Sequence, residues 1–143
     1  MKTTIDHIVI GTENLTLGTK ILERKLNANF LSGGEHSDMG THNNLLKLQS
    51  SIYLEIIARN HSINKKVRKR WFSLDDKDTI EKINKNPRSL CWLLSVNNIE
   101  NKVKNCGYDP GKIINLSRGN LKWKVTVPSN GKLIENGVLP FFI

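Results

Sequence analysis

The strongest constraint in this sequence is an internal repeat. When His7 is placed over Cys91, Asn14 falls on Asn98. In both copies a strand-like segment is followed by a helix-capping asparagine, a helical pattern, a glycine or asparagine stop, and further strand-like segments. Self-similarity of this kind indicates one structural unit used twice. The sequence therefore predicts two copies of strand–helix–strand–strand–strand whose curved sheets enclose a cleft.

The first module is expected over about residues 1–60. A run of β-branched residues predicts a strand over residues 5–10. Asn14 is a good N-cap for a helix over residues 15–26. Further strands are expected at residues 30–31, 41–48 and 52–58, with a loop over residues 32–34.

A polar connector is expected over about residues 61–88, and the second module over about residues 89–143. In the connector, a capping-box pattern that begins at Asp78 indicates a short helix over residues 79–84. The second module is expected to hold a strand at 90–96, a helix capped by Asn98, and strands at 112–114, 121–127 and 138–143. Its last strand is either complete or cut short at the C-terminal end, and the sequence leaves both open. The predicted fold class is α+β, with two repeated βαβββ modules that form curved mixed sheets around a cleft in a single domain of residues 1–143.

Composition narrows the class of protein. The 143 residues are enough for one domain with a hydrophobic core, and no apolar run approaches the roughly 20 residues that a membrane helix needs. Asp6 and His7 interrupt the N-terminal segment, which therefore lacks the apolar core of a secretory signal. Cys91 and Cys106 form no CxxC pair and indicate no disulfide framework. We therefore expect a cytoplasmic protein that does not associate with membranes.

A basic segment, residues 65–70, holds five lysines and arginines in six positions and contributes to a net charge of +9. It admits two interpretations: a patch that binds nucleic acid or another anionic surface, or a solvated connecting segment. No nucleic-acid-binding motif accompanies the segment, which favours the second interpretation. Nucleic acid is therefore not expected as a partner.

Several segments, in the expected order along the chain, resemble the glyoxalase-like domain of the vicinal oxygen chelate superfamily. They are Ile5–Val9, Gly40–Leu46, Tyr53–Ala58, Arg70–Asp75, Gly107–Gly111, Ser117–Gly119, Leu121–Trp123 and Gly137–Phe141. One such segment is a weak signal, but the ordered set spans nearly the whole chain. The resemblance implies a divalent metal, Zn, Ni, Fe or Mn, held by one residue from the first strand and one from the last strand of each module. It also implies Lewis-acid catalysis on a small oxygenated molecule, in a lyase, isomerase or dioxygenase reaction.

In the first module, the resemblance places the metal ligands at His7 and Glu55, and Glu55 would also be the catalytic residue. Alternation supports the first position, because it puts Asp6 and Ile8 on one face of the first strand and His7 on the other. Glu55 lies between two apolar neighbours in a strand-like segment. Burying a carboxylate there without a partner is costly, so Glu55 is more informative than a surface acid.

In the second module the ligand pattern is incomplete. Cys91 stands where the resemblance implies a third ligand, and the fourth position falls near Phe141. Cysteine can bind zinc as a thiolate, but a lone buried cysteine is more often a small apolar core residue. Phenylalanine has no atom that can coordinate a metal. A full four-ligand site is therefore not expected within this chain.

Four further residues are candidates for ligand or substrate binding, each with a structural alternative. His42 and Asn43 are expected at the start of a strand beside Glu55, where they would act as a substitute ligand and a substrate hydrogen-bond donor, or satisfy backbone groups. Arg118 would hold a substrate carboxylate through its bidentate guanidinium, or form a surface ion pair. Trp123 would line the cleft or belong to the core.

Two functions stay open at this point. The first is a metal-dependent lyase, isomerase or dioxygenase acting on a small oxygenated molecule, or a degenerate relative of such an enzyme. The second is a metal-free protein that binds and sequesters a small molecule in the same cleft. In either case a homodimer is expected, because the last predicted strand would leave an unfinished sheet edge that invites pairing.

Overall fold

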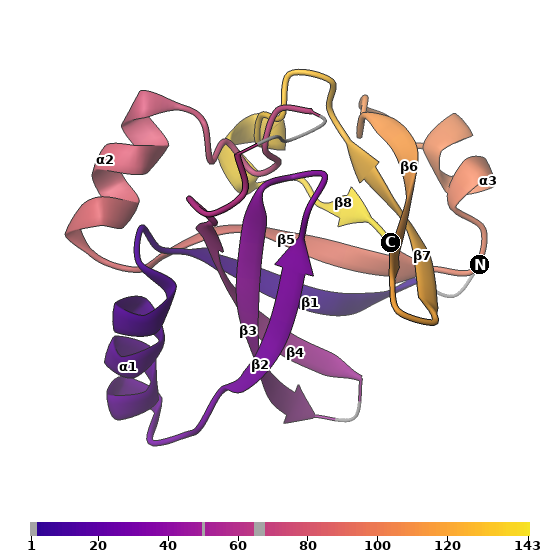
Figure 1. Ribbon diagram of the computed structural model, residues 1–143. Helices are drawn as coiled ribbons and strands as arrows, with labels where there is room; N and C mark the ends of the chain where they lie inside the picture. Colours follow the sequence, from indigo (N-terminus) through magenta and orange to yellow (C-terminus); the bar gives the residue numbers. More distant parts are fainter. Residues whose placement is uncertain (1–2, 50, 65–67) are drawn as a thin grey trace.

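The computed structural model describes residues 3–49, 51–64 and 68–143 and contains both βαβββ modules (Figure 1). The first module consists of β1 (Thr3–Gly11), α1 (Leu15–Leu26), β2 (Leu31–His36), β3 (Thr41–Gln49) and β4 (Ile52–Arg59). The second consists of β5 (Arg88–Val96), α3 (Ile99–Lys104), β6 (Lys112–Arg118), β7 (Leu121–Val127) and β8 (Phe141–Phe142). The connector holds α2 (Lys77–Lys85), and a short 3₁₀ helix, η1 (Ile134–Gly137), precedes β8.

The bounds of the helices can be compared with those predicted from capping residues and helical periodicity. Helix α1 has the predicted bounds because the Asn14 side chain accepts a hydrogen bond from the N–H of Leu17 at 2.9 Å, and Asn27 ends it in the left-handed conformation. Helix α2 begins at Lys77, ahead of the predicted capping box, with Asp76 as its N-cap residue. The predicted helix was therefore present but too short at both ends.

The two modules are joined through their first strands. A six-stranded sheet has the order β2-β3-β4-β1-β5-β8, and β6 and β7 form a separate hairpin. Strands β1 and β5 are antiparallel, with His7 opposite Leu93 and Val9 opposite Cys91. The counterparts of His7 and Leu93 in the other module are Cys91 and Val9, so the first of these pairs corresponds to the second. This is the register of two modules related by an approximate two-fold axis, and it supports the internal repeat.

The same register relates the last strands of the modules. Strand β4 runs parallel to β1 and places Glu55 opposite Val9. Strand β8 runs parallel to β5 and places Phe141 opposite Leu93, the counterpart of Val9. Phe141 therefore occupies, in the second module, the position that Glu55 holds in the first. Its ring is fully buried and lies edge-on to Phe72, with ring centroids 5.2 Å apart.

Strand β2 corrects one prediction, because residues 32–34 lie within a strand and not in a loop. The strand pairs with β3 in antiparallel fashion, with a register shift between Ser32 and Gly34. Gly33 is required by a close approach: a Cβ atom there would lie 2.1 Å from Oδ1 of Asn43. The glycines that suggested a loop thus allow an edge strand to pack closely against a side chain of β3.

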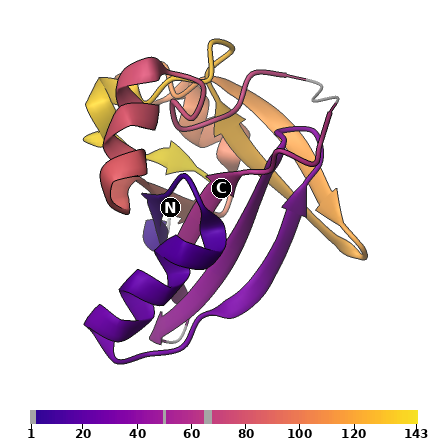
Figure 2. The same ribbon diagram turned by 60° about the vertical axis from the view of Figure 1, so that its left-hand side comes forward.

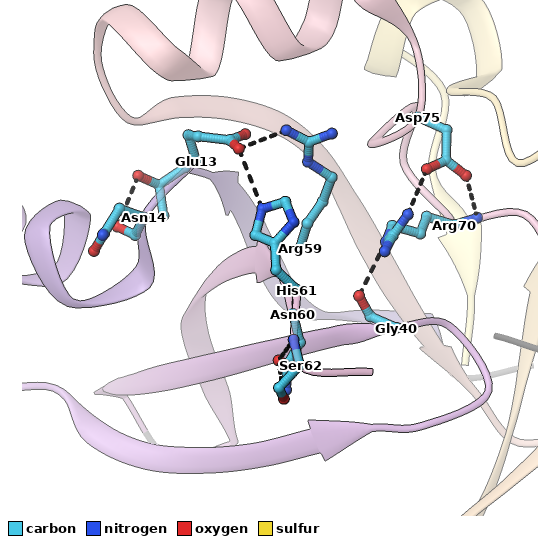
Figure 3. Close-up of polar contacts among 10 residues, drawn as sticks. Glu13, Asn14, Gly40, Arg59, Asn60, His61, Ser62, Arg70 and Asp75 are labelled. Atoms are coloured by element: carbon cyan, nitrogen blue, oxygen red, sulfur yellow. Dashed lines mark hydrogen bonds and ion pairs between the residues drawn. The ribbon is translucent and has the colours of Figure 1, made fainter. Parts of the chain in front are cut away.

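The first part of the connector is held by the carbonyl oxygen of Gly40, which lies just before β3. The backbone N–H of Asn60 and the Nε of Arg70 both donate to this oxygen, each at 2.9 Å. Asp75 holds the Arg70 guanidinium at 2.7 Å (Figure 3). These contacts fix the position of the next residue, Trp71, which is buried against the sheet.

A second set of contacts ties the start of the connector to the loop before α1. Oε1 of Glu13 lies 2.5 Å from a terminal nitrogen of Arg59 and 3.4 Å from Nε2 of His61 (Figure 3). Residues 65–67 of the basic segment lie outside the described residues, so its interpretation as a solvated connector stays a prediction. Within the described part of the chain, no helix is long and apolar enough to cross a membrane.

The longer helices and the β6–β7 hairpin lie on different sides of the molecule. Helices α1 and α2 lie on one side of the molecule and the β6–β7 hairpin on the other (Figure 2), while α3 lies beside the hairpin (Figure 1). The core includes buried side chains from the sheet, the connector and the hairpin: Val9, Ile57, Trp71, Phe72, Leu93, Val125 and Phe141. The hairpin is thus packed on the sheet by apolar contacts and not through a strand ladder.

Replacing Phe141 by Ala should lower the free energy of unfolding by about 3–5 kcal/mol, because it removes a fully buried ring and leaves a cavity beside Phe72. Leu121→Ala is the control: its side chain is 62% exposed, and its loss should change stability by less than about 0.5 kcal/mol. Chemical denaturation of the two variants measures both values. A loss for Phe141→Ala as small as that of the control would contradict the placement of β8 in the core.

Candidate ligand-binding site

A cleft of about 490 Å³ lies between the sheet and the β6–β7 hairpin. Strands β1, β3 and β4 are neighbours in the sheet, so side chains on one face of them converge to make its floor. The hairpin makes the opposite wall, and Trp71 and Phe72 of the connector also line the cleft. Its polar and aromatic lining includes Asp6, His7, His36, Asn43, Tyr53, Glu55, Trp71, Phe72, Arg118, Lys122 and Trp123.

His7 and Glu55 form the centre of the floor. Nε2 of His7 lies 3.3 Å from Oε2 of Glu55, and both side chains are buried. Nδ1 of His7 lies 2.7 Å from Oδ1 of Asp6. The Tyr53 ring stacks on the imidazole, with ring centroids 4.5 Å apart. The imidazole is therefore held between two carboxylates with one face against an aromatic ring.

Asn43 completes the floor by donating a hydrogen bond from Nδ2 to Oε1 of Glu55. The side chain faces the cleft because its neighbour Asn44 faces the other side of the sheet, where it donates to Oγ1 of Thr19 in α1 at 3.0 Å. Asn43 was expected either to contact substrate or to satisfy backbone groups at the start of the strand. Its amide instead holds the carboxylate of Glu55.

The charges of this cluster follow from its contacts. Burial by itself lowers the pKa of His7, but the hydrogen bonds to Asp6 and Glu55 and their negative charges outweigh it and raise the pKa from 6.5 to about 9. Burial would raise the pKa of Glu55, yet the hydrogen bond and charge of His7, with smaller contributions from His36 and Asn43, hold it below its ordinary value. At neutral pH the pair is an imidazolium and a carboxylate. Burial lowers the pKa of His36, so that side chain is neutral at the same pH.

A larger groove, of about 770 Å³, lies between α2 and the start of β5. Its charged side chains are mixed in sign: Asp75, Asp76, Lys77, Asp78, Lys82, Arg88 and Lys132. None of the site residues predicted from the sequence lies in this groove. The cleft on the sheet, which brings several of them together, is therefore the better candidate for the functional site.

The sequence profile of the glyoxalase-like domain family matches residues 5–143. The chain belongs to this family. Among curated proteins, none matches its sequence.

Solved structures share the fold of this glyoxalase-like domain. A hypothetical protein from Staphylococcus aureus is 20% identical, with a TM-score of 0.63, over 99% of this chain and 58% of that one, so this chain spans little more than half the length of that protein. Methylmalonyl-CoA epimerase from Mycobacterium tuberculosis is 14% identical, with a TM-score of 0.58, over 96% of this chain and 85% of that one. A methylmalonyl-CoA epimerase in complex with methylmalonyl-CoA and ammonium is 14% identical, with a TM-score of 0.64, over 99% of this chain and 94% of that one. At these identities the likeness establishes the fold alone.

A four-ligand centre for the divalent metal that is typical of the glyoxalase superfamily does not fit the donor atoms of this glyoxalase-like domain. Within residues 3–49, 51–64 and 68–143, no three His, Cys, Asp or Glu side chains are grouped so as to hold a metal ion. Phe141, the counterpart of Glu55, has no donor atom. Cys91 is buried and is not among the residues that line the cleft, and burial raises the pKa of its thiol well above the ordinary value. The second half of a four-ligand centre is therefore missing.

Of the remaining predicted site residues, the structure brings Arg118 and Trp123 into the cleft but not His42. Successive residues of a strand face opposite sides, so His42 points away from the face that Asn43 occupies. The position of His42 gives no support to the substrate-binding role expected from the sequence. His42 and Asn43 were predicted together because they are adjacent in sequence, but they lie on opposite faces of β3.

Asp6 and Tyr53 are among the cleft residues that were not predicted as site residues. Alternation placed Asp6 on the face opposite His7, and this is wrong: a register shift between Ile5 and His7 in the β1–β5 pairing turns Asp6 toward the cleft. Such a bulge leaves no signal in the local sequence. Tyr53, by contrast, precedes Glu55 by two positions on the same strand, so alternation alone could have found it.

Stability should fall as the pH rises through the pKa of His7. The folded-state value of about 9 lies above the ordinary 6.5, so the stabilisation by the charged imidazole is fully present below pH 6.5 and is lost as the pH passes 9. We expect a loss of about 3 kcal/mol over this window in the wild type, and a flatter profile for His7→Gln. Denaturation from about pH 6 to pH 10 measures both profiles, and ionisation of Cys91 acts on both proteins alike. Equal slopes would contradict the charged pairing of His7.

Asn43→Ala should leave one buried oxygen of Glu55 without its donor. We expect a higher pKa for Glu55 and a loss of about 1–3 kcal/mol of stability at neutral pH. Carboxyl NMR titration and chemical denaturation measure the two effects. Asn44→Ala is the matched control, because it removes the hydrogen bond to Thr19 and should leave the pKa of Glu55 unchanged. A shift of Glu55 in the control as large as in Asn43→Ala would show that the effect is not specific to the floor.

Proposed function

We propose that this glyoxalase-like domain binds a small oxygenated molecule with a flat, partly apolar body, and that it does so without a four-ligand metal centre. The proposal rests on the pairing of His7 with Glu55 on the floor, combined with Phe141 at the position where a fourth ligand would stand. Because the polar groups of the floor are held by one another, they present a fixed set of hydrogen-bonding atoms to a ligand. The phenylalanine offers no coordination at all.

The shape and lining of the cleft support binding of such a molecule. Its volume of about 490 Å³ lies within the range of about 300–1,000 Å³ that is usual for small-molecule sites. Trp71, Phe72 and Trp123 contribute flat apolar surfaces, while Asp6 and Glu55 contribute oxygen atoms on the floor. Mostly apolar walls with a few oriented polar groups are typical of sites that bind small organic molecules.

A metal-dependent lyase, isomerase or dioxygenase is the second candidate, and one observation favours it. His7 and Glu55 lie side by side on the cleft floor, at 3.3 Å, as two ligands of the first module would. In that case a Zn, Ni, Fe or Mn ion would take both side chains, and Glu55 would be the catalytic residue. The remaining coordination positions would have to be filled by water or substrate.

The uncharged aromatic dye N-phenylnaphthylamine, which fluoresces in apolar surroundings, tests the binding proposal. We expect a saturable site with a dissociation constant of roughly micromolar order. Ser95→Trp places an indole in the cleft and should abolish this binding. Leu17→Trp, on an exposed position of α1, adds the same side chain outside the cleft and should leave it unchanged. Dye binding that is absent, or that survives Ser95→Trp, would overturn the proposal.

Calorimetric titration with Zn, Ni, Mn and Fe(II) tests the second candidate. Weak uptake that is the same in the wild type and His7→Ala agrees with a metal-free cleft. A stoichiometric site that disappears in His7→Ala would favour the metal-dependent enzyme and contradict the metal-free proposal.

Two further properties complete the proposal. We propose that the domain forms a homodimer, since an edge strand of the sheet presents backbone N–H and C=O groups with which a second copy can pair. We also propose a cytoplasmic location, which rests on cysteine usage alone. Neither property enters the case for ligand binding.

A further inference from the structure

We infer, on the basis of the proposed function, that the ligand of this cleft carries an oxyanion, a carboxylate or a phosphate, bound by the guanidinium of Arg118. Arg118 ends β6, and Lys122 lies on the facing strand of the same hairpin, so both cations line the wall opposite the floor. The apolar body of the ligand would then lie against the aromatic surfaces of the cleft.

Arg118 differs from two other half-buried arginines. Arg59 holds Glu13 at 2.5 Å, and Arg70 holds Asp75 at 2.7 Å. Arg118 is also half-buried, yet its guanidinium forms no ion pair and no hydrogen bond with any residue of the described ranges, 3–49, 51–64 and 68–143. A guanidinium that is partly removed from water without a counter-charge is unfavourable. An anionic ligand would supply the missing partner.

The carboxylates of the cleft are already engaged elsewhere. Asp6 contacts Nδ1 of His7 and Glu55 contacts Nε2, so the two acids share one imidazolium. Arg118 and Lys122 add two further positive charges to the lining. Both acids are thus held by His7, and neither is paired with Arg118 or Lys122 in the described residues. A bound anion would meet these two cations and leave the hydrogen bonds of the floor intact.

The position of the guanidinium depends on a glycine across the cleft. A Cβ atom at Gly34 would lie 2.8 Å from Nη1 and 3.0 Å from Cδ of Arg118. The side chain therefore reaches from the hairpin of the second module to β2 of the first. The charge of Arg118 also contributes to the low pKa of His36, on the same strand as Gly34. Arg118 is thus placed where a ligand would enter between the two modules.

The geometry of the Arg118 guanidinium indicates which ligand groups it can bind. A guanidinium presents parallel N–H donors that match two oxygens of one carboxylate or phosphate. Trp123, which lies on the facing strand of the hairpin, offers a flat apolar surface close to this anion site. A molecule with one oxyanion and a flat body would satisfy both.

Two dyes with the same ring system test the inference. Anilinonaphthalene sulfonate carries an oxyanion, and N-phenylnaphthylamine lacks it. We expect the wild type to bind the anionic dye roughly tenfold more tightly, and Arg118→Gln to weaken the anionic dye far more than the neutral dye, which removes this preference. The preference should also shrink as salt concentration rises. Arg118→Lys keeps the positive charge but lacks the parallel N–H donors of the guanidinium, so it should retain part of the preference. It is the test variant if Arg118→Gln does not fold.

Arg24→Gln is the matched control, because it removes an arginine from an exposed position of α1 outside the cleft, and it should preserve the preference. Competition of anilinonaphthalene sulfonate by naphthoate and by naphthyl phosphate then distinguishes a carboxylate from a phosphate as the preferred group. Equal affinity for the two dyes, or an equal loss of both in Arg118→Gln, would overturn the inference while the binding proposal stands. Failure of both dyes to bind the wild type would overturn the binding proposal as well.

Discussion

The arrangement of the cleft floor depends on the buried carboxylate of Glu55 and on the groups that compensate its negative charge. Glu55 is only 5% exposed, and burial alone would favour its neutral form. His7 and Asn43 each engage one of its oxygens, and Asp6 holds the other nitrogen of His7. These side chains come from three neighbouring strands, so the cluster also settles which face of each strand is turned toward the cleft. Loss of any donor would leave a charge in the interior without a partner.

The second module fills the corresponding positions with apolar groups. Phe141 stands where Glu55 stands in the first module, and Cys91 is the counterpart of His7. Neither side chain needs a polar partner, and the Phe141 ring packs against Phe72 in the core. The two modules therefore share one backbone arrangement but differ in the side chains at these positions, which are polar in the first module and apolar in the second. The cleft between the modules has acids on its floor and cations on the hairpin.

Much of the fold was predictable because its signals are local. The asparagine caps and the helical pattern locate α1, and alternation locates β1 and β4. The prediction failed at residues 32–34, where two glycines resemble a loop but form part of an edge strand paired with β3. That pairing depends on the close fit of Gly33 against Asn43, a contact between segments that periodicity cannot detect. Helix α2 was found but with different bounds, because its N-cap residue makes no side-chain cap.

The sequence by itself determined the order of elements, the repetition of the module, and the identity of the residues at the four positions from which a metal centre would be built. The order of elements and the repetition follow from residue type and spacing along the chain, and the four positions follow from the resemblance to the glyoxalase-like domain. Only the tertiary structure decided that Asp6 turns toward His7, that Asn43 donates to Glu55, that His42 lies outside the cleft lining, and that the Arg118 guanidinium lines the cleft without a partner among the described residues. Each of these depends on a bulge, a strand register or a contact between modules. Such contacts join residues that are distant in sequence, and no local pattern specifies them.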